Sequence, residues 1–333
     1  MTVISPSSFL VADIGGTNAR FAIADADGQG RPTLAAIREL RASEYPTLAA
    51  AAGDYLASLG TERPRTGVFA VASPVTSDAI RFTNSPWSFS VRALQTELAL
   101  EALVLINDFA AVAHAVANLR RDDVRAIGVD TTTLAGDGGD GHYVVLGPGT
   151  GLGVGALARR GGVSIVIETE GGHVGFAPGN AYELKLLEAL WRDHPRISAE
   201  RLLSGQGLLN LYRAVCAVDG EPASVDTPEQ ISRQAAAAPE SACGRSVALF
   251  CELLGAFAGD AVLMHGAWGG VYLAGGITQK LLPWIERGGF RGRFESKGRF
   301  ETLMKRVPVL AITHPQPGLL GAAARGLLAR PDR

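Results

Sequence analysis

The sequence predicts an α/β fold, and three observations support this. Short apolar runs at 67–72 and 103–107 are typical of strands buried on both faces of a sheet. A predicted helix at 109–119 follows the second run directly, and such alternation is typical of α/β domains with a central sheet. Two Gly- and Thr-containing turns, each between two apolar runs, lie about 130 residues apart, a spacing consistent with domain sizes. The pair predicts two similar half-structures facing each other across a cleft.

The first of these turns connects two predicted antiparallel strands at 9–14 and 18–24. It contains Gly15, Gly16, Thr17 and Asn18, with Asp13 just before it. Glycine lets the backbone approach a ligand closely, and the N–H groups of a tight turn form an anion site to which the Thr17 hydroxyl adds a donor. The Asp13 carboxylate would repel phosphate directly but suits a phosphate-bound Mg²⁺. The alternative is an ordinary hairpin, since Asn and Gly are common turn residues.

The second turn has the same construction. Its predicted strands are 143–146 and 152–157, and the chain between them reads Gly-Pro-Gly-Thr-Gly. The candidate phosphate contacts here are Gly149, Thr150 and Gly151. A glycine-rich turn that binds no ligand would explain either segment alone. It explains the presence of both segments less well. The pair therefore indicates a polyphosphate ligand.

The remaining elements continue the α/β pattern. Residues 120–141 are predicted to be a polar crossover, and the GxGxxG match that begins at Gly136 precedes a strand instead of opening a helix, which argues against a dinucleotide site. In the first half we expect a strand at 33–40, a helix at 47–58 and a helix from the N-cap Ser90 to Leu98. The later predicted strands are 162–168, 269–277 and 307–312, and the later helices are 181–193, 206–218, 228–237, 245–267 and 317–328.

Asn107 and Asp108 lie at a predicted strand-to-helix junction. Residues at the carboxyl end of a buried strand face the crevice in which open α/β sheets bind ligands. A helix N-terminus nearby would keep the Asp108 carboxylate ionised and available as a proton acceptor. The alternative is that Asp108 only caps the helix, and this alternative is favoured when the junction is considered alone.

A second polar segment contains Glu168, Glu170 and His173 around a glycine pair, and Glu200 lies at a predicted helix start. A carboxylate and an imidazole at this spacing can hydrogen-bond vicinal hydroxyls, as in sugar recognition. A metal site is the less favoured alternative because no cysteine or second histidine is close, and a simple polar turn is another. Gly275 and Gly276 follow an apolar strand, where either a planar base or the next helix could approach the backbone.

The amino-acid composition limits the classes of partner that the protein can bind. The 333 residues are 47% hydrophobic, with 31 basic against 33 acidic residues, which gives no basic field for nucleic acid or an anionic membrane. The three cysteines form no CxxC pair, and no signal-peptide pattern is present at the N-terminus, so we expect a cytoplasmic protein. Apolar stretches are interrupted by Gly, Pro or a charge before they reach membrane-spanning length.

Taken together, these motifs closely resemble those of the bacterial glucokinases, hexokinase-type members of the actin/Hsp70/sugar-kinase superfamily. The resemblance extends over almost the whole chain, and the order and spacing of the motifs make it specific. It rests on Asp13–Arg20, Leu105–Phe109, Gly147–Val154, Glu170–His173, Ser198–Arg201, Ala274–Gly276, Ser296–Phe300 and Pro317–Gly321.

The resemblance implies a two-domain actin-like ATPase (ribonuclease H-like) fold with a ligand cleft between the domains. The small domain would comprise residues 8–118 and 313–330, and the large domain residues 119–312. The implied activity is ATP-dependent phosphorylation of glucose to glucose 6-phosphate, the first step of glycolysis, with Mg²⁺ accompanying ATP. A cytoplasmic homodimer is implied by the resemblance alone.

The resemblance also implies roles for matching residues. Asp108 would be the general base that takes the proton of the glucose 6-hydroxyl, and Asn107, Glu170, His173 and Glu200 would bind the other sugar hydroxyls. The 13–18 and 147–151 segments would hold the phosphates of Mg²⁺-ATP, with Gly275 and Gly276 beside adenosine. No residue is assigned as a dedicated metal ligand.

Other functions stay open at this stage. A kinase for another hexose fits the same motifs, and a hydrolase of the superfamily is a more distant alternative. The zinc-containing branch of the sugar kinases is disfavoured because its cysteine cluster is absent. A sugar-sensing regulator without turnover is the non-enzyme alternative, although Asp108 and both phosphate turns argue against it.

Overall fold

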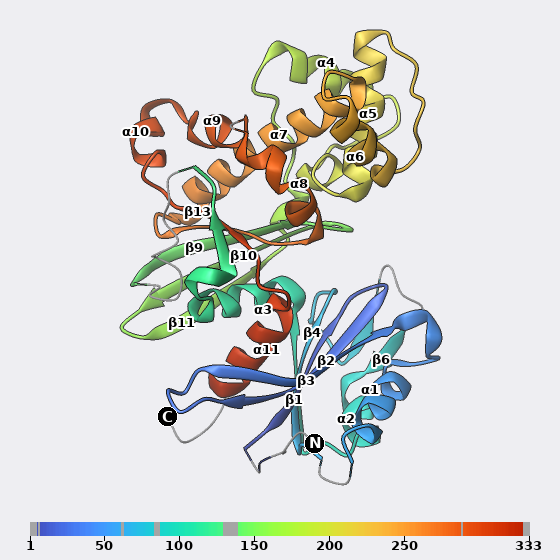
Figure 1. The fold of residues 1–333 in the computed structure, drawn as a ribbon, viewed down its shortest axis with the longest axis vertical. Coiled ribbons are helices and arrows are strands. Elements are labelled where there is room, and N and C mark those ends of the chain that lie inside the picture. Colours follow the sequence, from blue (N-terminus) through green and yellow to red (C-terminus); the bar gives the residue numbers. More distant parts are fainter. Residues whose placement is uncertain are drawn as a thin grey trace. The chain divides into compact units, whose positions relative to one another are not determined.

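A computed structural model describes residues 5, 7–60, 63–82, 87–128, 139–287 and 289–328. The chain separates into two compact units (Figure 1). Unit 1 contains the described residues up to Arg120 and those from His314 onward, and unit 2 contains the described residues from Arg121 to Thr313. Each unit has its own β-sheet and its own hydrophobic core.

Unit 1 is built on a five-stranded sheet. Its strands are β1 (Phe9–Ile14), β2 (Asn18–Ala26), β3 (Pro32–Arg41), β4 (Thr66–Val71) and β7 (Ala102–Asn107), in the order β3-β2-β1-β4-β7. The first three strands are antiparallel neighbours, whereas β1, β4 and β7 run parallel. The carboxyl ends of the three parallel strands therefore share one edge of the sheet. A separate two-stranded sheet consists of β5 (Ala79–Arg81) and β6 (Ser88–Ser90).

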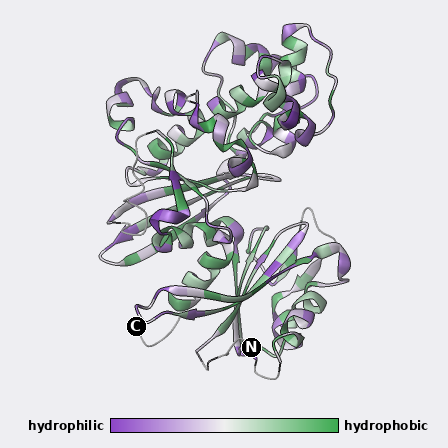
Figure 2. Ribbon diagram, in the orientation of Figure 1, coloured by the Kyte–Doolittle hydropathy of each residue, from purple (hydrophilic) through white to green (hydrophobic). Residues whose placement is uncertain are grey.

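Helices cover both faces of this sheet. They are α1 (Leu48–Ala57), α2 (Val91–Glu97), α3 (Asp108–Ala115) and the C-terminal α11 (Pro317–Leu328), with short 3₁₀ turns η1 (Ala42–Glu44) and η2 (Val116–Asn118). Leu10 of β1 packs in the core that contains α1, whereas Val11 packs in the core that contains α11. Neighbouring residues of a strand point to opposite faces, so a strand covered on both sides is apolar throughout. Figure 2 shows that α11 is hydrophobic over most of its length.

Unit 2 has a six-stranded sheet. Its strands are β8 (Val124–Ala126), β9 (Gly141–Pro148), β10 (Leu152–Arg160), β11 (Val163–Thr169), β12 (Gly270–Leu273) and β13 (Val309–Ile312), in the order β11-β10-β9-β12-β13-β8. Strands β9, β12 and β13 are parallel, and β8, β10 and β11 are antiparallel to their neighbours. The β9–β10 hairpin therefore repeats the arrangement of β1 and β2 in unit 1.

The helices of unit 2 pack around the long helix α7. They are α4 (Ala181–Leu190), α5 (Gly205–Asp219), α6 (Pro228–Ala237), α7 (Ala242–His265), α8 (Gly276–Glu286), α9 (Gly289–Glu295) and α10 (Glu301–Met304), with 3₁₀ turns η3 (Arg121–Asp123), η5 (Gly171–His173), η6 (Ala199–Arg201) and η7 (Gly298–Phe300). Among the described helices, α7 alone is long and apolar enough to cross a membrane, although Arg245, Glu252 and Asp260 interrupt its apolar sequence. Its apolar window is 67% buried within the protein, as in a core helix.

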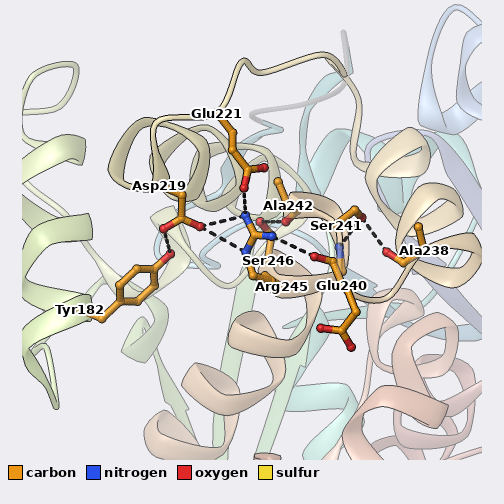
Figure 3. A network of polar contacts seen from close by, with 10 residues as sticks. Tyr182, Asp219, Glu221, Ala238, Glu240, Ser241, Ala242, Arg245 and Ser246 are labelled. Carbon is orange, nitrogen blue, oxygen red and sulfur yellow. Dashed lines mark hydrogen bonds and ion pairs between the residues drawn. The ribbon is translucent and has the colours of Figure 1, made fainter.

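A polar network joins three of these helices (Figure 3). Arg245 of α7 donates hydrogen bonds to the carboxylates of Asp219 (2.9 Å) and Glu221 (2.6 Å). Tyr182 of α4 donates to the other Asp219 oxygen (3.0 Å), and burial together with this bond raises the pKa of Tyr182 to about 12. The network holds the C-terminal end of α5 between α4 and the start of α7.

The structure places most of the predicted elements where the sequence suggests. Helices α6 and α11 have the predicted bounds, Ser90 caps α2, and the predicted helix at 181–193 ends earlier, at Leu190. The predicted crossover at 120–141 contains the short strand β8, which pairs with β13. The Gly136 and Gly138 positions of the GxGxxG match lie outside the described residues.

The packing of α11 against α3 depends on Gly321. A Cβ atom at this position would overlap the carbonyl oxygen of Ala111. We expect Gly321→Ala to lower the free energy of unfolding by about 1–3 kcal/mol, because the two helices must move apart. The control is Gly292→Ala in α9, where no atom of the described residues lies within 4 Å of the added methyl group. Alanine there should raise stability by up to about 1 kcal/mol through helix propensity. Urea denaturation measures both changes, and equal effects at the two sites would contradict the packing argument.

Candidate active site

The first glycine turn closes the β1–β2 hairpin of unit 1. The backbone N–H of Gly15 donates to the carbonyl of Asn18 at 2.9 Å, and Ile14 pairs with Ala19. Thr17 is exposed at the tip of the turn, and its carbonyl accepts a hydrogen bond from the N–H of Ala42. The hydrogen bond from Ala42, which follows β3, therefore fixes the backbone of the turn, while the tip of the turn is accessible to a ligand.

Asp13 lies beside this turn, on the side that faces the start of α11. A Cβ atom at Gly318, in the first turn of α11, would lie 2.6 Å from Asp13 Oδ2, so only glycine lets the helix start this close. Arg20, directly opposite on β2, forms an ion pair with Asp13 at 3.7 Å and also donates to Glu39. Burial raises the pKa of Asp13, and the Arg20 charge opposes this rise. An additional cation beside Asp13 would favour its ionised form further.

Asn107 and Asp108 end β7 and begin α3. Asn107 is the N-cap, and its Oδ1 accepts hydrogen bonds from the N–H groups of Phe109 (2.9 Å) and Ala110 (3.2 Å). The alternative that Asp108 serves as the N-cap is therefore wrong, because Asp108 is the first helical residue. Its Oδ1 accepts from the N–H of Phe109 at 2.9 Å. The carboxylate therefore lies at the N-terminal end of α3, beside the free N–H groups of its first turn.

The sheet brings these two parts of unit 1 to the same edge. Ile14 at the end of β1 pairs with Val71 at the end of β4, and Val71 pairs with Asn107 at the end of β7. Two strand spacings separate β1 from β7, which corresponds to about 10 Å. The Asp13 turn and Asp108 are thus neighbours along one edge.

The second glycine turn joins β9 to β10 in unit 2. Within it, the N–H of Gly149 donates to the carbonyl of Gly151 at 2.8 Å. The carbonyl of Gly149 also accepts a hydrogen bond of 2.9 Å from the N–H of Gly205, the first residue of α5. The start of α5, which is capped by Ser204, therefore lies against the turn. Backbone N–H groups at a helix start attract anions.

The start of α8 lies against the same turn. Gly275 precedes α8 with a φ of +88°, and a Cβ atom there would lie 2.6 Å from the carbonyl oxygen of Pro148. Strand β12, which leads into Gly275, runs parallel to β9, so both strands end at the same edge. The predicted phosphate turn and the predicted adenosine segment at Gly275 and Gly276 are thus brought together within unit 2.

Glu170, His173 and Glu200 form a cluster in unit 2. His173 Nε2 lies 3.9 Å from Glu170 Oε2, and His173 Nδ1 lies 3.9 Å from Glu200 Oε1. These separations exceed hydrogen-bond length, so the cluster can accept or donate hydrogen bonds to hydroxyl groups of a ligand. The side chains of Glu170 and His173 are 63% and 57% exposed. Among the described residues, no group of three His, Cys, Asp or Glu side chains has an arrangement that could hold a metal ion.

Glu200 connects this cluster to the glycine turn. Its Oε2 accepts a hydrogen bond of 2.9 Å from the N–H of Leu152, the first residue after the turn. A Cβ atom at Gly151 would lie 2.5 Å from the same oxygen. Any residue other than glycine at 151 would therefore displace the Glu200 carboxylate. The predicted phosphate and sugar residues of unit 2 are in direct contact.

Backbone pairing fixes the segment that carries His173 against the segment that carries Glu200. The N–H of Ala199 donates to the carbonyl of Val174, and the N–H of Phe176 donates to that of Ile197. Arg196 adds a side-chain bond, from its Nη2 to the His173 carbonyl at 2.6 Å. These contacts set the distance between the imidazole and the Glu200 carboxylate.

Sequence reasoning did not identify three residues that position the site. Arg196, Gly205 and Gly318 each contact a predicted site residue that is distant in the chain. Gly205 had a usable signal, because Ser204 before it is a typical N-cap. Gly318 also had one, because it lies in the Pro317–Gly321 motif. Arg196 had none, since its contact arises from packing.

Trp87 is a core residue of unit 1: it is 3% exposed, and its Nε1 donates a hydrogen bond to the Tyr45 carbonyl.

Comparisons with known proteins show the family to which the chain belongs. The family model described as Glucokinase matches residues 10–328. A glucokinase of Stenotrophomonas maltophilia (strain R551-3) is 46% identical over 329 residues, which cover 98% of this chain and 97% of that protein. The crystal structure of glucokinase from an Antarctic psychrotroph has a TM-score of 0.85 and 34% identity, covering 96% of this chain and 98% of that one.

A more distant structure has the same fold. A ROK family glucokinase from Streptomyces griseus, solved in complex with glucose and AMPPNP, has a TM-score of 0.60 and 21% identity, covering 95% of this chain and 98% of that one. The predicted α/β fold of the actin-like sugar kinases is confirmed. With the family match over nearly the whole sequence, the chain belongs to the Glucokinase family.

Proposed function

We propose that this protein transfers the γ-phosphoryl group of ATP to the 6-hydroxyl of glucose, giving glucose 6-phosphate and ADP in the first step of glycolysis. The observation that carries the proposal is the contact of the Glu170, His173 and Glu200 cluster with the glycine turn, in a chain of the Glucokinase family. Its relative from Streptomyces griseus was solved with glucose and AMPPNP. A hexose-binding group beside a phosphate-binding turn is what such a transfer requires.

In this proposal the two turns hold the triphosphate. In unit 2, the starts of α5 and α8 converge on the turn at Gly149, Thr150 and Gly151, with Gly275 and Gly276 beside adenosine. In unit 1, the turn from Gly15 to Asn18 contributes N–H groups and the Thr17 hydroxyl. Mg²⁺ would neutralise phosphate charge. The Asp13 carboxylate would suit such a cation, because Mg²⁺ prefers oxygen ligands and its charge would offset the burial that raises the pKa of Asp13.

Asp108 acts as the general base. Its carboxylate accepts the proton of the 6-hydroxyl as the oxygen attacks the γ-phosphorus and ADP leaves. Asn107, Glu170, His173 and Glu200 bind the remaining hydroxyls and orient the sugar. Phosphoryl transfer depends on positioning and charge stabilisation more than on covalent chemistry, and these residues supply the positioning.

We propose that unit 1 and unit 2 correspond to the predicted small domain (8–118 with 313–330) and large domain (119–312). We also propose a cytoplasmic homodimer, as the resemblance to bacterial glucokinases implies.

The activity is tested by measuring ADP formation from Mg²⁺-ATP with glucose, fructose, mannose or no sugar. We expect rapid, glucose-dependent turnover that stops when EDTA removes the Mg²⁺. ADP release without sugar would indicate a hydrolase instead, and tight glucose binding without ADP formation would indicate a sensor. Faster turnover with fructose or mannose would assign the enzyme to another hexose.

Asp108→Asn should lower kcat by roughly 10²–10⁴-fold, because an amide cannot accept the hydroxyl proton. Steady-state kinetics measures the loss, and circular dichroism should show an unchanged fold. Asp193→Asn, at an exposed aspartate, is the matched control and should retain full activity. Near-normal turnover by the Asp108 variant would exclude the general-base role.

Arg196→Ala should raise the KM for glucose about 3- to 10-fold, corresponding to the ~1 kcal/mol of one hydrogen bond. Its effect on kcat should be small, since Arg196 positions His173 and takes no part in proton transfer. Arg213→Ala removes an exposed arginine that pairs with the exposed Asp226 and serves as the control. An equal loss in kcat, or no change in KM, would contradict the positioning role.

A further inference from the structure

The first two turns of α5 carry a series of hydrogen bonds between amide groups, here called the amide relay. Asn210, which is 8% exposed, donates from its Nδ2 to the carbonyl of Arg201 at 3.1 Å. Its Oδ1 accepts a hydrogen bond of 3.1 Å from Nε2 of Gln206, one turn earlier in the helix. Gln206 is exposed. The amide relay therefore connects a backbone carbonyl to a side-chain amide at the surface.

The amide relay fixes which end of the Gln206 amide faces outward. A backbone carbonyl only accepts hydrogen bonds, so the Asn210 atom beside the Arg201 carbonyl must be the nitrogen. Asn210 Oδ1 then faces Gln206 and requires the Gln206 nitrogen as its donor. Gln206 Oε1 is left on the side away from Asn210, and none of the described residues donates a hydrogen bond to it. The start of α5 thus presents an acceptor in a defined orientation.

Gln206 lies where the starts of α5 and α8 meet. It follows Gly205, whose N–H donates to the carbonyl of Gly149 in the glycine turn. Ile277, the second residue of α8, reaches the same place, since its Cδ1 lies 3.9 Å from the position of a Cβ atom at Gly205. Ile277 is half-buried and packs against the core of unit 2. An apolar side chain and an oriented acceptor thus lie beside the glycine pair proposed to border adenosine.

We propose that Gln206 selects the base of the phosphoryl donor: its Oε1 accepts a hydrogen bond from the exocyclic amino group of adenine, while Ile277 contacts the apolar face of the base. The inference rests on the proposed ATP site and names the residue that recognises the base. Adenine carries an amino donor where guanine carries the acceptor O6. Two acceptors that face each other repel and leave both unsatisfied, so this orientation of Gln206 favours adenine.

The first test compares the binding of Mg²⁺-ATP and Mg²⁺-ITP to the whole protein by isothermal titration calorimetry. ITP has the ribose and phosphates of ATP but carries hypoxanthine, in which O6 replaces the amino group. The wild-type protein should bind ATP about 5- to 100-fold more tightly, because ITP leaves Gln206 Oε1 facing an acceptor. Purine riboside triphosphate, which lacks the exocyclic group, should bind with intermediate affinity. Equal affinities for ATP and ITP would overturn the proposal.

Gln206→Leu removes the acceptor and keeps much of the length of the side chain. The ratio of the two Kd values should fall close to 1, mainly because ATP binds more weakly. The matched control is Gln279→Leu, at an exposed glutamine in the first turn of α8, which should keep the wild-type ratio. An unchanged ratio in Gln206→Leu would overturn the proposal. A loss of preference confined to Gln279→Leu would assign base recognition to α8 and also overturn it.

Asn210→Leu tests whether the amide relay sets the orientation of Gln206. Without Asn210 Oδ1, the Gln206 amide can rotate and present its NH₂ group to O6, so ITP should bind more tightly than to the wild-type protein and ATP more weakly. A purely structural role of Asn210 would weaken both nucleotides equally, and this result would overturn the proposed orientation. The ratio of two Kd values for one variant does not depend on the fraction of protein that is folded.

Measuring binding and turnover side by side separates this inference from the proposed function. A protein that prefers ATP to ITP but forms no glucose 6-phosphate would support base selection and overturn the kinase assignment. Rapid phosphorylation of glucose together with equal affinity for the two nucleotides would overturn base selection alone. A protein that binds neither nucleotide would overturn both.

Discussion

The contact between the Glu200 carboxylate and the β9–β10 turn is the constraint on which the rest of the candidate site depends. The carboxylate accepts the Leu152 N–H, and it can do so only because Gly151 has no side chain in its path. One oxygen of Glu200 is thereby hydrogen-bonded to the residue that follows the turn, while the other oxygen lies near His173. The parts proposed to hold phosphate and sugar are one connected structure, so a change in one shifts the other.

The two units share one local arrangement of a glycine hairpin and a helix start. Each places a glycine hairpin at the edge where its parallel strands end, and each sets a helix start against that hairpin. In unit 1 the helix is α11, which reaches Asp13 through Gly318; in unit 2 the helices are α5 and α8, which reach the turn through Gly205 and Gly275. A buried parallel sheet leaves only its strand ends accessible to ligands, which explains why the proposed chemistry lies there.

Local elements and much of the candidate site could be predicted from the amino-acid sequence. The bounds of α6 follow from the Thr227–Gln230 capping box and the proline after Thr227, and the β1–β2 and β9–β10 hairpins follow from glycines between apolar runs. These signals act between residues close in the chain, where the conformational choices are few. The three-residue strands β5, β6 and β8 carry no such signal, because their existence depends on a partner strand.

Which distant residues come into contact could be seen only in the folded protein. Glu200 reaches Leu152 across 48 positions of sequence, and Gly318 lies against Asp13 from the opposite end of the chain. The tertiary structure also decided that Asn107, and not Asp108, caps α3, since the strand direction and the helix axis select which side chain can reach the free N–H groups. Contacts of this kind are set by how sheets and helices pack, and packing is a property of the whole chain that no local pattern contains.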